Sequence, residues 1–127
     1  MKITIPVEPR TKKNSMRLVK LKNRIVPIPS KQYKEFEEKC LDHLLPYIDL
    51  LINYPVNICC LFYMKTRRKV DLTNLLEAVD DILVRYSVLV DDNSQIVAGH
   101  DGSRVYYDKD NPRIEIDITG MEAANDQ

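Results

Sequence analysis

Two stretches decide the fold: VNICCLFYM at residues 56–64 and LTNLLEAVDDILVRY at residues 72–86. The first stretch is apolar at both odd and even positions, which predicts a central strand that is covered on both faces of a sheet. In the second stretch, apolar residues recur at helical spacing, and polar residues that include Asp80 and Asp81 fill the opposite side. This pattern predicts an amphipathic helix with one apolar face turned to the core.

Alternating apolar residues predict further strands on both sides of these two stretches. The expected strands are residues 2–7, 96–100, 104–107 and 113–118. An earlier helix is predicted after Ser30, a candidate N-cap, because apolar residues from Tyr33 to Leu44 recur at helical spacing. The order strand, helix, strand, helix, strands predicts an α+β domain in which two helices pack on one face of a small mixed β-sheet.

The segment of residues 8–30 has no helical period and is rich in Pro, Lys, Arg and Asn. We therefore expect a long basic loop there, with at most a short strand at residues 24–26. Loops of this length in a compact domain are usually functional or mobile. The chain of 127 residues suits a single domain over residues 1–127, with a tail that is frayed from residue 120 onward.

The composition argues against several classes of protein. No apolar stretch approaches the roughly 20 residues that span a membrane, and the first residues lack the apolar region of a signal peptide, so we expect a cytoplasmic protein. The cysteines Cys40, Cys59 and Cys60 show no C-x-x-C spacing, and adjacent residues of a strand point to opposite faces. We therefore expect buried, reduced thiols. The two histidines are too far apart in sequence to suggest a zinc site.

The formal net charge of zero hides an uneven distribution of charge along the chain. The first 34 residues contain ten Lys and Arg residues but only one acid, Glu8, and a second basic run covers residues 65–69. Acidic residues gather from position 71 onward. Cations that bind a phosphate backbone, beside carboxylates that bind a metal, suit an enzyme that cuts phosphodiesters. The alternative is a soluble surface with uneven charge.

Carboxylates at three places could bind such a metal. Asp71 stands at the start of the second predicted helix, Asp81 lies on its polar side, and Asp91 and Asp92 follow it. Mg²⁺ takes one or two protein carboxylates and keeps several waters, so a pair would suffice. A helix over residues 72–86 is about 22 Å long, so Asp71 and Asp92 meet only if the chain returns along it. The alternatives are an ordinary N-cap, a solvated helix face and a turn.

The segment VDLTNLLEAVDDIL at residues 70–83, followed by VDDNSQI at residues 90–96, resembles the signature of the RusA family. That signature is Asp-x-Asp-Asn-Leu-x-Lys, a later Asp in the same helix, and then Asp-Asp followed by Gln and an apolar residue. Residues 6–15 resemble the family's opening basic loop, and NPRIEI at residues 111–116 resembles its last strand. The resemblance therefore covers nearly the whole chain.

The resemblance implies a RusA-like fold and a homodimeric Holliday-junction resolvase, a crossover junction endodeoxyribonuclease of DNA recombination and repair. Such an enzyme makes symmetric paired nicks in four-way DNA junctions with Mg²⁺, or with Mn²⁺ in its place. Two-fold symmetry suits paired cuts, because the two sites are then related by the same axis. The resemblance matches Asp71 and Asp92 with metal-binding aspartates, with Asp91 beside them, and it matches Asp81 and Asn74 with the helix aspartate and the asparagine of the motif.

Two positions depart from the family pattern: Thr73 stands in place of the second Asp, and Glu77 stands in place of the Lys. These residues are four apart and so are neighbours on one helix face. Our hypothesis is that Glu77 replaces the missing acid. The candidate catalytic residues are then Asp71, Glu77, Asp81, Asp91 and Asp92, and the candidate metal ligands are Asp71, Asp91 and Asp92. The candidate DNA-binding residues are Lys12, Lys13, Arg67, Arg68, Lys69 and Asn74.

Three alternatives remain open at the level of the sequence. Asp71 and Asp92 could suffice for catalysis without help from Glu77. The chain could instead be a catalytically weak or inactive protein that binds branched DNA, which predicts salt-sensitive binding without metal-dependent cleavage. It could also be an acidic metal-binding or protein-interaction domain, which predicts no affinity for branched DNA.

Overall fold

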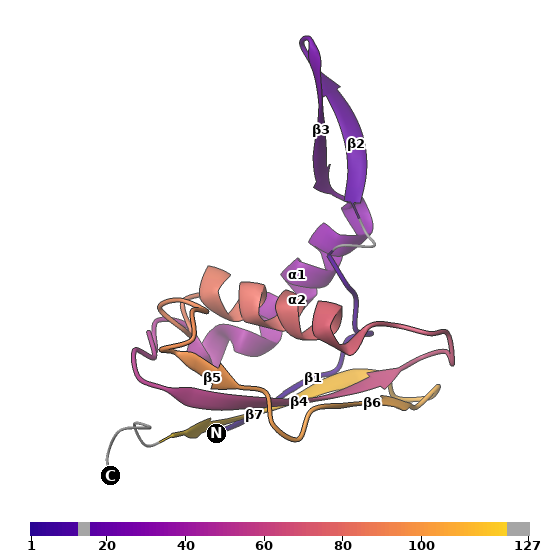
Figure 1. Cartoon of the computed structure of the whole chain (residues 1–127). Helices are drawn as coiled ribbons and strands as arrows, with labels where there is room; N and C mark the ends of the chain where they lie inside the picture. The colour runs from indigo at the N-terminus through magenta and orange to yellow at the C-terminus, as the bar shows by residue number, and fades with distance from the viewer. Residues whose placement is uncertain (13–15, 122–127) are drawn as a thin grey trace.

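The computed structural model describes residues 1–12 and 16–121. Its larger sheet has five strands, and both helices, α1 (Lys31–Leu44) and α2 (Leu72–Arg85), lie on one face of it (Figure 1). The strands of this sheet are β1 (Lys2–Ile5), β4 (Val56–Met64), β5 (Val97–Gly99), β6 (Arg104–Tyr107) and β7 (Arg113–Gly120). The predicted α+β fold, with two helices on one face of a small mixed sheet, is confirmed.

The strand β4 is the centre of the sheet, as its apolar sequence predicts. It pairs antiparallel with β7, which in turn pairs antiparallel with β1. Its other edge pairs in parallel with two short strands, β5 near its beginning and β6 near its end. The mixture of parallel and antiparallel pairs arises because β5 and β6 are reached by the crossover through α2.

The two faces of β4 are covered to different degrees. Val56, Ile58, Cys60 and Phe62 are fully buried toward the helices, whereas the alternate residues from Asn57 to Tyr63 are half-buried. Both helices of the described part of the chain lie on the first face, so the predicted cover on both faces is complete on that face and only partial on the other. An apolar run indicates only that its residues avoid water. On the far face of β4, side chains of neighbouring strands can shield these residues without a second layer of helices or strands.

The helix α1 begins and packs as predicted. The Oγ atom of Ser30 accepts a hydrogen bond from the Tyr33 N–H at 3.2 Å, which is an N-cap. Tyr33, Phe36, Cys40 and Leu44 are buried at helical spacing, and a short 3₁₀ helix, η2 (Leu45–Tyr47), follows. All three cysteines are free thiols, and burial is the largest cause that raises the pKa of Cys40 to about 12.

The prediction of a long basic loop over residues 8–30 is wrong for its second half. That half forms a two-stranded antiparallel hairpin of β2 (Met16–Leu21) and β3 (Arg24–Pro29), and the strand expected at residues 24–26 is only the first part of β3. Pro, Lys and Arg are typical of loops, so the composition predicts a loop. The structure instead has two short strands that pair across a two-residue turn. Figure 1 shows the hairpin standing away from the rest of the molecule.

The last strand also extends further than the sequence predicts. Gly120 belongs to β7, and the Met121 N–H donates a hydrogen bond to Pro55 O at 2.9 Å, so the chain is ordered past the start of the expected tail. The remainder of that tail lies outside the described residues. In the described part of the chain, no helix is both long and apolar enough to cross a membrane.

Candidate active site

The start of α2 presents Asp71. Asp71 occupies the N-cap position with an extended backbone, but its side chain makes no capping hydrogen bond. Its Oδ2 atom instead accepts a hydrogen bond from Asn74 Nδ2 at 3.2 Å, and the residue is exposed. The usual reason for an Asp at this position, a capped backbone N–H, is therefore absent. The carboxylate is held by Asn74 and open to solvent.

Farther along α2, Asp81 lies among other charged groups. Burial of its side chain is the largest cause that raises the pKa of this carboxyl; nearby Lys12 lowers the pKa, whereas Asp92 and Glu77 raise it further. Glu77 is one helical turn before Asp81 on the same face. The charges that shift this pKa come from three segments of the chain: Glu77 from α2, Asp92 from the loop after it, and Lys12 from the segment after β1.

Asp91 is held by its own loop. Its Oδ1 atom accepts a hydrogen bond from the Asp92 N–H at 2.7 Å, and its Oδ2 atom accepts one from Asn93 Nδ2 at 3.1 Å. The hydrogen bond from the Asp92 backbone, followed by the one from Asn93, lowers the pKa of Asp91. Asn93 Oδ1 in turn accepts the Gln95 N–H at 2.9 Å. Asp91 therefore orders the loop that positions Asp92 near Asp81.

Asp71 and Asp92 lie toward different ends of α2. Asp71 follows the end of β4, whereas the chain after α2 pairs with the segment before β4: the Ile52 N–H donates a hydrogen bond to Val88 O at 2.9 Å. Figure 1 shows α2 running back over β4 between these two places. Asp81, the neighbour of Asp92, is about 15 Å from Asp71 along the helix axis. Within residues 1–12 and 16–121, the return of the chain that a site within one subunit requires is therefore not observed.

A Mg²⁺ site requires acidic side chains that lie close enough together to bind one ion. Among residues 1–12 and 16–121, no three His, Cys, Asp or Glu side chains form a group that could hold one. Carboxylates are the ligands that Mg²⁺ prefers, but a single chain divides them between two parts of α2. Within the described residues, one chain therefore does not bring Asp71 and Asp92, the pair matched with the family's metal ligands, to one metal.

The basic run before α2 is exposed at the Asp71 end of the helix. Its candidate DNA-binding residues are Arg67, Arg68 and Lys69. The guanidinium carbon of Arg67 lies 4.0 Å from the centroid of the Tyr107 ring, a cation–π contact that holds this side chain against β6. Lys12 is exposed and its charge lowers the pKa of Asp81, farther along the helix, and Lys13 lies outside the described residues.

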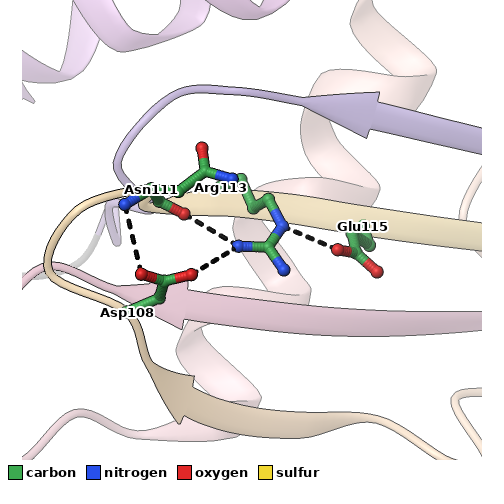
Figure 2. A network of polar contacts seen from close by, with 4 residues as sticks. All are labelled: Asp108, Asn111, Arg113 and Glu115. Carbon is green, nitrogen blue, oxygen red and sulfur yellow. Dashed lines mark hydrogen bonds and ion pairs between the residues drawn. The ribbon is translucent and has the colours of Figure 1, made fainter.

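The turn that follows Tyr107 is fastened by Arg113, which the sequence did not single out. Figure 2 shows its guanidinium donating to Glu115 through Nε at 2.6 Å, and to Asp108 and Asn111 O through Nη1, both at 2.9 Å. The guanidinium also lies 3.7 Å from the centroid of the Tyr63 ring. This network holds the end of β6 in place, and with it the surface on which Arg67 rests.

A second pair that the sequence did not reveal is Asp80 and His100. Asp80 is buried, so its prediction as a solvent-facing residue is wrong. His100 Nε2 lies 2.9 Å from Asp80 Oδ2, and Nδ1 lies 3.0 Å from Ile58 O. Both ring nitrogens face acceptors, which favours the imidazolium form, and the hydrogen bond with Asp80 is the largest cause that raises the pKa of His100. His100 is 20 residues away in sequence, so only the fold brings the pair together.

Replacement of Asp80 by Asn should remove a part of the stability that depends on pH. The pKa of His100 is raised in the folded state, so its contribution is complete below the ordinary value of about 6.5 and is lost as pH rises through the folded-state value. We expect Asp80→Asn to lower the free energy of unfolding by about 2 kcal/mol near pH 6, and by less above about pH 8. Urea unfolding at both pH values measures this difference.

The matched control for this prediction is Asp110→Asn, the same chemical change at an exposed position. It should change the free energy of unfolding by less than about 0.5 kcal/mol at either pH. A loss in Asp80→Asn that is equally large at both pH values would contradict the assignment of a charged His100. An NMR titration of the His100 ring should show a lower pKa in the same variant.

Comparison with known proteins identifies a family for this chain. A family model described as endodeoxyribonuclease RusA matches residues 6–119, a span that includes both helices and every candidate site residue. A search of curated proteins found no match. Because the family match covers most of the chain and the fold is the α+β arrangement expected for it, the chain belongs to the RusA family of endodeoxyribonucleases.

Proposed function

We propose that this protein is a homodimeric, Mg²⁺-dependent endonuclease that resolves four-way DNA junctions by symmetric paired nicks, with Mn²⁺ able to replace Mg²⁺. The observation that supports it is a set of acids on and after α2, here called the acidic ridge: Asp71 at the start of the helix, and Glu77, Asp81 and Asp92 farther along the chain. Exposed cations lie near both parts of this ridge. Membership of an endodeoxyribonuclease family supports DNA as the substrate.

The proposed metal site is completed between two subunits. In a two-fold dimer, every contact between residues i and j occurs twice, once in each direction. If two α2 ridges face each other in antiparallel orientation, Asp71 of one subunit approaches Asp92 of the partner subunit, and the reverse contact forms a second site. This arrangement would bring together two aspartates that lie apart within one chain. It also yields the two equivalent sites that paired nicks require.

The side chains have separate proposed roles. Mg²⁺, when bound, supplies an activated water and stabilisation of the leaving oxygen. Asn74 orients the Asp71 carboxylate, and Asp91 orders the loop that carries Asp92. Glu77 and Asp81 complete the acidic surface one turn apart. The phosphate-binding cations are Lys12, Lys13, Arg67, Arg68 and Lys69, which act on the backbone and read little sequence.

A cleavage assay tests this function. We expect the purified protein to nick a labelled four-way junction at symmetric positions in the presence of Mg²⁺, and to leave the junction intact in EDTA. A linear duplex that contains the sequence of one arm should be cut at least about 100-fold more slowly. In the same assay, cleavage by Glu77→Gln at the wild-type rate would refute the idea that Glu77 replaces the missing acid.

The change at Thr73 and Glu77 also supports a second candidate, a branched-DNA-binding protein that cuts weakly or not at all. Tight, salt-sensitive binding of the junction without nicks in Mg²⁺ or Mn²⁺ would favour this candidate over the nuclease. Absence of junction binding under the same conditions would exclude both.

A further inference from the structure

The hairpin of β2 and β3 is a separate feature of the molecule and is not part of the acidic ridge. It extends from the body beside the start of α1, and its two strands pair with each other over six residues each (Figure 1). An isolated two-stranded hairpin is marginally stable in water, because it has no third strand or helix to bury its side chains. No residue of the described hairpin belongs to the hydrophobic core that would stabilise it.

One face of the hairpin exposes apolar side chains beside Lys20 to solvent. Paired residues of an antiparallel ladder share a face, so the pairs Leu18–Pro27 and Lys20–Ile25 lie together on this face. The exposed fractions on this face are 74% for Leu18 and 65% for Ile25, and Leu21, which pairs with Arg24 on the opposite face, is 50% exposed. Large apolar side chains this exposed on a protruding arm indicate a surface that another molecule covers.

The same hairpin is basic and has no acids to balance its charge. Lys20, Lys22 and Arg24 are exposed around the tip, and no Asp or Glu occurs between Glu8 and Glu35. Within the described residues, none of these three cations forms an ion pair. A positive arm with exposed apolar side chains complements nucleic acid, in which phosphates surround the flat apolar faces of bases.

The alternative occupant, a strand from a second copy of the chain, fits less well. Pro27 and Pro29 lie in β3 and have no N–H to donate to an added strand. Two basic hairpins placed side by side would also repel each other. The composition of the arm thus favours DNA over self-association.

We propose that the β2–β3 hairpin inserts into the branch point of the DNA junction: Lys20, Lys22 and Arg24 bind phosphates, and Leu18 and Ile25 pack against bases that are unstacked there. This inference rests on the proposed junction-binding function and adds the element that recognises the branch. Apolar wedges of this kind are known to separate base steps and to repay the lost stacking with contacts to the opened DNA.

The test uses the full chain and a four-way junction that carries 2-aminopurine next to the branch point, in Ca²⁺ so that binding is measured without dependence on cleavage. Unstacking increases the fluorescence of this base. Wild-type protein should increase the fluorescence at saturation, and L18S/I25S should lose most of that increase. K20Q/K22Q/R24Q should bind the junction at least about 10-fold more weakly near 0.1 M salt, and should reduce the slope of log affinity against log salt by up to about 3.

The control is K2Q/K39Q, a variant with lost cations on β1 and α1 rather than on the hairpin. Lys2 pairs across the sheet with Asp117, and Lys39 lies one helical turn after Glu35, so both have acidic neighbours. This control should keep the fluorescence increase and change the affinity by less than about 3-fold. Circular dichroism verifies that each variant keeps the fold, which is expected because the hairpin lies outside the core.

Each outcome has a distinct meaning. If the wild type binds and cuts the junction but L18S/I25S and K20Q/K22Q/R24Q behave like it, the hairpin proposal is wrong and the proposed function stands. If the wild type does not bind the junction, both are wrong. If K20Q/K22Q/R24Q binds weakly but L18S/I25S keeps the full fluorescence increase, the hairpin holds phosphates without entering the branch, and the insertion proposal is overturned.

Discussion

Two variants that are each inactive should restore junction cleavage when they are mixed. We expect Asp71→Asn and Asp92→Asn each to lower cleavage by more than about 100-fold, because each removes a proposed metal ligand from both sites of the homodimer. After the subunits exchange, cleavage by the mixture should recover to about one quarter of the wild-type level, as single nicks rather than paired ones. A nicking assay on a labelled junction measures both quantities.

Cleavage is expected to recover because the two aspartates of each proposed site come from different subunits. A heterodimer of the two variants has one site that lacks both aspartates and one site that retains both, because Asp71 comes from one subunit and Asp92 from the other. A site within one chain has the opposite property, since each subunit then lacks one of its own ligands. The separation of Asp71 and Asp92 along α2 is the structural reason to expect a shared site.

The reciprocal mixture is the control for this prediction. Wild-type protein combined with the double variant D71N/D92N should form heterodimers in which both sites are incomplete. Excess double variant should therefore suppress wild-type cleavage almost fully. If the mixture of single variants stays inactive while the wild-type heterodimer keeps nicking, the site lies within one chain and the proposed dimer arrangement is refuted. A wild-type protein that sediments as a monomer in the presence of junction and Ca²⁺ would also contradict it.

Truncation of Phe62 should be the most destabilising single change in the centre of the sheet. Phe62 is fully buried on β4, on the face that both helices cover. Loss of its ring leaves a cavity that the surrounding core cannot close completely. We expect Phe62→Ala to lower the free energy of unfolding by about 3–5 kcal/mol, measured by urea denaturation at neutral pH.

The matched control is Leu61→Ala, one residue earlier on the opposite and half-buried face. We expect it to cost about 1–2 kcal/mol, because less of its apolar surface is removed from water and solvent can fill the space that it leaves. Equal losses in the two variants would mean that the far face of the sheet is packed as tightly as the helix face, for instance by a partner subunit.

The sequence determined those features that depend on neighbouring residues. The helical period of residues 72–86 and the cap at Ser30 define α2 and α1, and the apolar run of residues 56–64 defines the central strand. The acidic positions and the motif around Asp71 identify the family, because spacing along a helix and order along the chain are local properties. All of these appear in the structure within one or two residues of their predicted bounds.

Only the tertiary structure decided which distant residues meet. It buries Asp80 against His100, brings the charge of Lys12 near enough to lower the pKa of Asp81, and keeps Asp71 apart from Asp92. It also pairs two basic, proline-containing segments into a hairpin where composition predicts a loop. These outcomes depend on how the sheet is ordered and where the chain crosses it. Periodicity reports which face of an element is apolar, but only the arrangement of elements selects the partner that each polar side chain finds.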